Sequence, residues 1–209
     1  MPAIDYYYSI RSVYAYFGSR RIIALAKRFG RTLRHRPIDL SRVVPAAGSV
    51  PFAERSATLR AYQFGREVER WSEWLDIPVI IDPVHHYGDR ALPSGLVLAA
   101  QQAGFDADAL SDAMLTALWR DDRDIAERAV LTDIAAAVGI DAIPLLERAL
   151  APDIRSEFEA ATTEAIHIGV LGSPTYVIDG EPFYGQDRLM LVERQLERPF
   201  RANSQRVAC

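Results

Sequence analysis

The sequence predicts an α/β fold in which a small β-sheet packs against helices and a long helical segment interrupts the chain. Three observations support this prediction: a strand–helix–strand pattern at the amino end, an alanine-rich middle with few strand signals, and a hairpin followed by a helix near the carboxyl end. The chain has 209 residues, of which 49% are hydrophobic and 25% charged. This composition is ordinary for a globular protein, and the length suffices to bury a core without disulfides.

The amino-terminal pattern occupies residues 4–40. Residues 4–8 are β-branched and aromatic and predict a strand. Apolar residues recur at helical spacing over residues 13–29, and Gly30 marks the end of that helix. Residues 33–40 predict a second strand. A strand–helix–strand unit of this kind implies parallel strands that are joined by a right-handed crossover.

The middle of the chain, residues 50–165, predicts a helical insertion. Gly104 and Gly139 follow the apolar runs LVLAAQQA and IAAAV, and each is expected to end a helix. Leu110, Met114 and Leu118 fall on one helical face. Such an apolar face is typical of core packing.

The carboxyl-terminal pattern begins with the segment TYVI at residues 175–178. Asp179 and Gly180 follow it, which is a strong signal for a hairpin, and residues 181–184 supply the partner strand. Residues 187–196 predict a helix with an acidic start. The order βαβ, helical block, ββα is that of a thioredoxin-like fold with a large all-helical insertion. We assign residues 1–49 and 166–209 to a discontinuous thioredoxin-like domain and residues 50–165 to an inserted helical domain.

The charge and the cysteine content exclude several function classes. A net charge of −4 and a pI near 5.6 give no broad positive field for nucleic acid or an anionic membrane. No apolar run approaches the ~20 residues of a membrane helix, and no signal peptide is expected. Cys209 is the one cysteine, so we expect no disulfide, no CxxC redox motif and no zinc site, and we interpret Cys209 as a tail thiol without a role. These observations indicate a cytoplasmic protein.

Two places are candidates for chemistry. Ser12 lies in the turn before the first helix, where a helix amino end favours an anion. A serine there is also a good helix N-cap, so both interpretations stay open. Pro174 directly precedes a buried strand, and a cis bond from Ser173 would explain it. In that geometry the backbone of Ser173 would turn outward and pair with an extended, peptide-like ligand.

The motifs in four segments resemble one known family. The segment AIHIGVLGSPTYVIDGEPFYGQDRL at residues 165–189 resembles the carboxyl-terminal signature of the kappa-class glutathione transferases and the 2-hydroxychromene-2-carboxylate isomerases, which belong to the DsbA-like thioredoxin superfamily. YYYSIRSVYAYFG, RPIDL and WRDDRDIAERAVLTDIAAAVGID resemble further segments of the same family in the same order. The resemblance implies a homodimeric enzyme of aromatic-compound degradation, with glutathione as cofactor and a small aromatic or unsaturated acid as substrate.

The resemblance also implies roles for individual residues. Ser12 corresponds to the family's catalytic serine and Pro174 to its cis-proline, and the backbone of Ser173 would hold the cysteinyl part of glutathione. Gln186 and Asp187 correspond to positions that bind the γ-glutamyl end, where Asp187 suits an ammonium group. Asp187 could instead be an ordinary first-turn acid.

Arg60 falls near a lysine that binds the cofactor in the family, with a solvated surface arginine as the alternative. His85 and His86 are adjacent, lack the spacing of a metal pair, and are interpreted as residues of a polar loop. We therefore expect no metal site.

The implied reaction is an isomerisation in which a thiolate adds to a conjugated carbon, the ring opens, a bond rotates and the thiolate leaves. A kappa-like transferase, in which the conjugate is released, is the first alternative. Ser9 and Val13 stand where the family usually has an acidic residue and a proline. This departure leaves a second alternative open, namely a catalytically degenerate module that binds glutathione.

Overall fold

The computed structural model describes residues 2–201 and has a four-stranded sheet at its centre. β1 (Ala3–Tyr8) pairs in parallel with β2 (Thr32–Pro37) and antiparallel with β3 (Thr175–Ile178), and β3 pairs antiparallel with β4 (Glu181–Tyr184). The strand order is β2-β1-β3-β4. This order and the helical middle confirm the predicted fold class. Cys209 lies outside the described residues.

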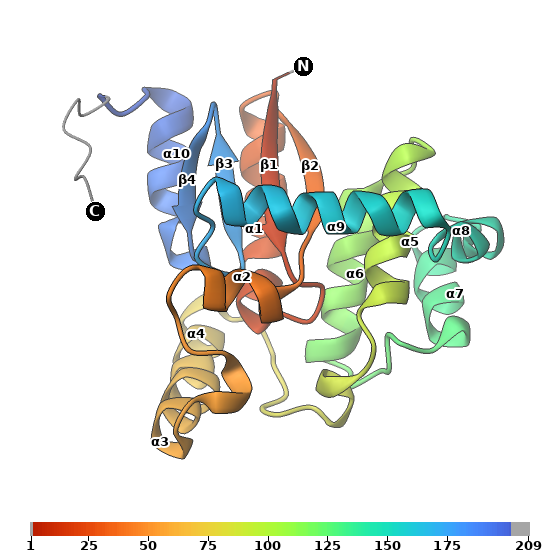
Figure 1. Cartoon of the computed structure of the whole chain (residues 1–209), viewed down its shortest axis with the longest axis horizontal. Coiled ribbons are helices and arrows are strands. Elements are labelled where there is room, and N and C mark those ends of the chain that lie inside the picture. Colours follow the sequence, from red (N-terminus) through yellow and green to blue (C-terminus); the bar gives the residue numbers. More distant parts are fainter. Residues whose placement is uncertain (1, 202–209) are drawn as a thin grey trace.

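Helices cover both faces of the sheet. α9 (Pro152–His167) crosses one face, while α1 (Val13–Arg28) and α10 (Leu189–Glu197) lie on the other (Figure 1). α2 (Leu40–Ala46) packs against α9. A short 3-10 helix, η4 (Gln186–Arg188), precedes α10.

The middle of the chain is helical, as predicted. Its elements are η1 (Phe52–Glu54), α3 (Ala57–Arg60), the π-helix η2 (Ala61–Arg66), α4 (Glu67–Leu75), η3 (Val84–Tyr87), α5 (Ala91–Gln102), α6 (Ala107–Trp119), α7 (Arg128–Ala137) and α8 (Ala142–Arg148). Gly104 and Gly139 follow α5 and α7 with φ of +77° and +76°. Both glycines therefore end their helices in the left-handed conformation, as the sequence predicts.

The tyrosines of β1 face opposite sides of the sheet, as the period of a strand requires. Tyr6 and Tyr8 belong to a large core that continues from α1 into α5, α6 and α7. Tyr6 stacks on Tyr8 and on Tyr176, with ring centroids 4.2 and 5.4 Å apart. Tyr7 belongs to a second core that includes Ala161 of α9. Buried side chains thus fix the sheet on both faces and fix the position of the turn that follows β1.

Two segments differ from the sequence-based expectation. The second strand ends at Pro37, and residues 40–46 form α2, which begins because the Asp39 side chain accepts a hydrogen bond from the Ser41 N–H. The last helix begins at Leu189 rather than at Asp187, because residues 186–188 form the 3-10 turn η4. The proposed domain boundary after residue 165 falls within α9 and stays a prediction.

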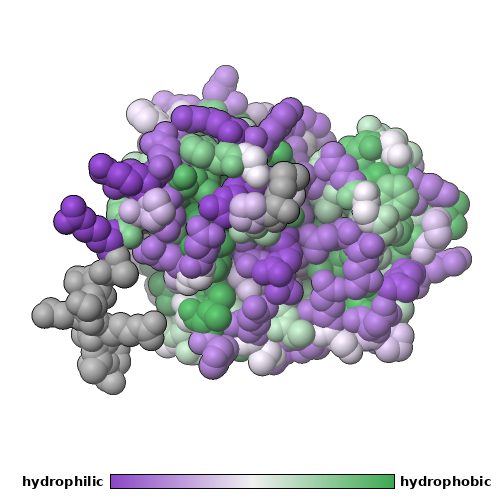
Figure 2. All heavy atoms as spheres, turned by 90° about the horizontal axis from the view of Figure 1, so that it is seen from above, coloured by the Kyte–Doolittle hydropathy of each residue, from purple (hydrophilic) through white to green (hydrophobic). Residues whose placement is uncertain are grey.

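The surface is mainly polar on the face that Figure 2 shows, where hydrophilic side chains separate smaller hydrophobic areas. Among residues 2–201, no helix combines the length and the apolar character that a bilayer crossing requires.

Candidate active site

Ser12 is the N-cap of α1. Its side chain accepts a hydrogen bond from the Ala15 N–H at 3.2 Å. The same hydroxyl lies 3.5 Å from the backbone oxygen of Ser173, toward which it can donate. The capping interpretation of Ser12 is therefore confirmed. It is compatible with a second role, because the hydroxyl also faces the loop that precedes β3.

The amino end of α1 presents unpaired backbone donors beside Ser12. Within residues 2–201, neither the Val13 N–H nor the Tyr14 N–H has a hydrogen-bond acceptor. The first amides of any helix lack intrahelical partners, and the helix dipole makes the same end favourable for negative charge. The end of α1 can therefore stabilise an anion next to the Ser12 hydroxyl.

The loop before β3 is fixed against this turn. The Ser173–Pro174 peptide bond is cis, as predicted. The Ser9 N–H donates to the Ser173 hydroxyl at 3.0 Å, and the Gly185 N–H donates to the Pro174 carbonyl at 2.8 Å. The structure thus brings Ser12, Ser173 and Pro174 together from the two ends of the chain.

Gln186 and Asp187 continue the candidate site along α1. Gln186 is buried, and its Oε1 accepts a hydrogen bond from Arg21 of α1 at 2.6 Å. Its Nε2 is buried without a partner among the described residues, so a donor is left unsatisfied there. Asp187 is half-buried and forms an ion pair with Arg188, its neighbour in sequence.

Gly185 positions this segment. It has a φ of +104°, and an added Cβ would lie 2.3 Å from Oδ1 of Asp187. Any side chain at this position would therefore displace the carboxylate.

Arg60 lies in a different place from the other predicted residues. It lines a cavity of about 250 Å³, which we call the aromatic cavity. The walls of this cavity include Val13, Phe52, Phe64, His86, Tyr87 and Trp119. Nη1 of Arg60 donates to the carbonyls of Ala53 and Arg55, which fixes the guanidinium at that wall. Since Val13 follows Ser12, the aromatic cavity opens beside the amino end of α1.

Arg11 is a site residue that the sequence reasoning missed. It is 7% exposed, and its guanidinium donates to the carbonyls of His85, His86 and Asp89, with the shortest contacts at 2.5 Å. Burial and the nearby positive charge of Arg90 lower its pKa, against the carboxylates of Asp124 and Asp89. Arg11 therefore attaches the loop that carries η3 to the turn that carries Ser12.

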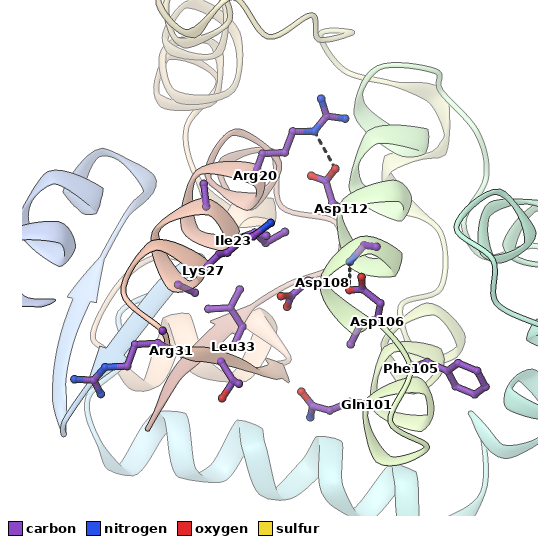
Figure 3. A pocket seen from close by; sticks show the side chains of 16 residues that line it. Arg20, Ile23, Lys27, Arg31, Leu33, Gln101, Phe105, Asp106, Asp108 and Asp112 are labelled. Atoms are coloured by element: carbon purple, nitrogen blue, oxygen red, sulfur yellow. Dashed lines mark hydrogen bonds and ion pairs between the residues drawn. The ribbon is translucent and has the colours of Figure 1, made fainter. Parts of the chain in front are cut away.

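A larger hollow of about 910 Å³ lies elsewhere, between α1 and α6 (Figure 3). Arg20 of α1 and Asp112 of α6 form an ion pair at its edge, with Nε and Oδ2 2.9 Å apart. None of the predicted site residues lines it. We therefore place the candidate site at the smaller aromatic cavity, where anion-stabilising groups lie beside apolar walls. The described residues hold no group of three or more His, Cys, Asp and Glu side chains that could bind a metal.

Comparisons with known proteins identify the family and the relatives of this chain. The model of a DSBA-like thioredoxin domain matches residues 3–197. A 2-hydroxychromene-2-carboxylate isomerase of Sphingobium xenophagum is 28% identical over 193 residues, which are 92% of this chain and 97% of the relative. Glutathione S-transferase kappa 1 of Caenorhabditis elegans is 24% identical over 212 residues, 95% of this chain and 92% of the relative. The resemblance that the motifs indicate is thus confirmed.

Two solved structures show the same fold. A 2-hydroxychromene-2-carboxylate isomerase has a TM-score of 0.77 at 23% identity, covering 94% of this chain and 95% of that one. The cytosolic disulfide reductase DsbM from Pseudomonas aeruginosa, solved with GSH, has a TM-score of 0.66 at 21% identity, covering 94% and 93%.

Proposed function

This chain belongs to the family of DSBA-like thioredoxin domains, and we propose that it is a glutathione-dependent isomerase of a small aromatic or unsaturated acid. It is an enzyme of this family, whose curated relatives include an isomerase and a transferase. One observation carries the proposal: the Ser12 hydroxyl and the free amides of α1 lie beside the Ser173 backbone and at the edge of the aromatic cavity. This arrangement can stabilise a thiolate next to an apolar binding space.

The residues present fit glutathione. The Asp187 carboxylate suits the ammonium group of a γ-glutamyl end, and the unpaired Nε2 of Gln186 suits its carboxylate. The Ser173 backbone suits the cysteinyl part of a peptide, which it would hold as a short added strand. Bound glutathione would supply a thiolate as nucleophile.

Ser12 has the task of stabilising that thiolate. A hydrogen bond to a charged group contributes ~1.5–3 kcal/mol, which is enough to lower a thiol pKa by one to two units. Val13 replaces a proline of the family and therefore adds a backbone N–H at the helix start, where a proline would have none. This N–H is a second donor for negative charge. The presence of Val13 in place of the proline is therefore compatible with catalysis.

The aromatic cavity has the task of binding the substrate. Phe52, Phe64 and Trp119 offer apolar faces for a planar ring, and Arg60 offers a positive charge for a carboxylate. A cavity with apolar walls and few polar groups is the common form of a small-molecule site.

The experiment that tests this proposal is an assay of 2-hydroxychromene-2-carboxylate with and without glutathione. We expect conversion to a ring-opened isomer that depends on glutathione but does not consume it. The similarity to a kappa-class transferase favours one alternative, in which a glutathione conjugate accumulates instead. Mass spectrometry of the products separates the two activities. Absence of both activities, together with absence of glutathione binding, would refute the proposal.

A further inference from the structure

The loop that carries η3 is attached to the active-site turn by a buried cation. Arg11 directly precedes Ser12, and its Nη1 and Nη2 contact the carbonyl oxygens of His85 and Asp89, each at 2.5 Å. Nη1 also donates to the His86 carbonyl at 3.2 Å. Gly88 permits this approach, because an added Cβ would lie 2.7 Å from Nη2 of Arg11. The backbone of His86 is thus held at a fixed place relative to Ser12.

The ring of His86 points to the aromatic cavity. Its centroid lies 4.8 Å from that of Trp119, 4.8 Å from Tyr87 and 6.3 Å from Phe52. Within residues 2–201, neither ring nitrogen of His86 forms a hydrogen bond of normal geometry, although the backbone of Arg11 lies near enough to the ring to raise its pKa. The imidazole is therefore held in place by packing against these rings and by the contacts of its own backbone.

His85 differs from His86 although it is adjacent. The His85 side chain is 40% exposed, and its Nδ1 lies 3.5 Å from Oδ2 of Asp124. It does not line the aromatic cavity. The interpretation of both histidines as polar loop residues therefore fits His85, but it leaves the position of His86 unexplained.

We propose that His86 is a proton-transfer residue of the isomerisation and that Arg11 is the positioning residue that holds it beside the aromatic cavity. This inference rests on the proposed function. It adds a group that the thiolate chemistry lacks, because Ser12 and the helix amides stabilise negative charge but accept no proton.

The step balances without any further reactant. A 2-hydroxychromene is a cyclic hemiketal, whose opening removes a proton from the hydroxyl, forms a carbonyl and breaks the bond from that carbon to the ring oxygen. Neutral His86 accepts this proton and then gives it to the phenolate that the broken bond leaves. The product is an isomer, and the imidazole returns to its starting state.

The surroundings of His86 keep it neutral near neutral pH. Burial and the positive charge of Arg11 lower its pKa, while the negative charge of Asp82 and the backbone of Arg11 act in the opposite direction. Arg60 and Tyr87 are the other charged or titratable side chains on the cavity wall. A lowered pKa makes the imidazole a base over a wider pH range, so activity should fall only at a pH below the ordinary pKa of histidine.

The test compares His86→Gln with the matched variant His85→Gln. For His86→Gln we expect a turnover lower by ~10²–10⁴-fold and loss of the acidic limb of the pH profile. Glutathione affinity and the melting temperature should stay at the wild-type values. His85→Gln should retain wild-type turnover and the acidic limb. An NMR titration of the His86 ring should show a response to 2-hydroxycinnamate, an aromatic acid without a hemiketal, that His85 lacks.

The outcomes separate this inference from the proposed function. An active wild type with an equally active His86→Gln variant and an unchanged acidic limb would overturn the role of His86 alone. A wild type that opens no hemiketal would refute the proposed function and this inference together. A His86 ring that does not respond to 2-hydroxycinnamate would also overturn the inference, because the ring would then not face a bound ligand.

Discussion

The hydroxyl oxygen of Ser12 and the backbone oxygen of Ser173 lie 3.5 Å apart, although 161 positions separate the two residues in sequence. Ser12 ends the turn after β1, and Ser173 lies in the loop that leads to β3. The two strands are neighbours in the sheet, so the pairing of β1 with β3 brings these two segments together. The contact defines the place where a peptide-like ligand would meet both the serine and the amino end of α1.

Removal of the Asp187 charge should weaken glutathione binding. In Asp187→Asn we expect the affinity to fall about tenfold or more, because an ammonium group would lose an ion-pair partner at a half-buried site. Calorimetric titration with glutathione measures this. Asp179→Asn is the matched control, since Asp179 is an acid in the turn of the preceding hairpin whose carboxylate pairs with Arg31 instead. Equal affinities for the two variants would show that Asp187 is an ordinary surface acid.

Gly18→Ala should disturb the segment that holds Gln186. The added Cβ would lie 2.4 Å from the buried Tyr176 hydroxyl and 3.2 Å from Cβ of Gln186. We expect a loss of ~1–3 kcal/mol in the free energy of unfolding, together with weaker glutathione binding. Denaturant unfolding measures the first effect. Gly65→Ala is the control, because a Cβ at Gly65 meets nothing within 4 Å. A Gly18→Ala protein as stable as that control would contradict the close packing of α1 on Gln186.

Gly88→Ala should loosen the loop that Arg11 holds. The new Cβ would stand 2.7 Å from Nη2 of Arg11, so the guanidinium or the loop must move. We expect turnover to fall several-fold while glutathione affinity stays unchanged, because the atoms nearest to that Cβ belong to Arg11 and Asp124 and not to Gln186 or Asp187. Steady-state kinetics and calorimetry on the same sample test this. A variant with weakened glutathione binding and normal turnover would contradict this prediction, because the loop would then contribute to the glutathione site and not to turnover.

The sequence predicted the fold well because its signals are local. The aromatic strand, the hairpin at Asp179 and Gly180, and the glycines that end helices depend on residues close in sequence. The predicted second strand is too long because it includes Asp39. The backbone of Asp39 is extended, but its side chain caps α2. The cis bond before Pro174 and the proximity of Ser12 to Ser173 followed from the family resemblance and the strand order.

Other parts of the site could not be predicted from the sequence. Arg11 forms hydrogen bonds with backbone carbonyls of residues 85–89. Every residue type has a backbone carbonyl, so the sequence does not indicate where these acceptors lie. His86 and Arg60 reach one cavity from different segments, and their convergence depends on the packing of the helical middle on Val13. A pair of adjacent histidines gives no sign of which one faces a cavity.

The titration of bound glutathione tests the central claim most directly. Its thiolate absorbance should appear at a lower pH on the wild-type protein than in free solution, where a cysteine-like thiol has a pKa near ~8.5. In Ser12→Ala the titration should move up by about one to two units, because one hydrogen bond to the charged sulfur is lost. Loss of the N-cap should also lower stability by ~1 kcal/mol. A Ser12→Ala protein that is less stable but titrates as the wild type does would show that Ser12 only caps α1, and would contradict its proposed role in activating the thiol.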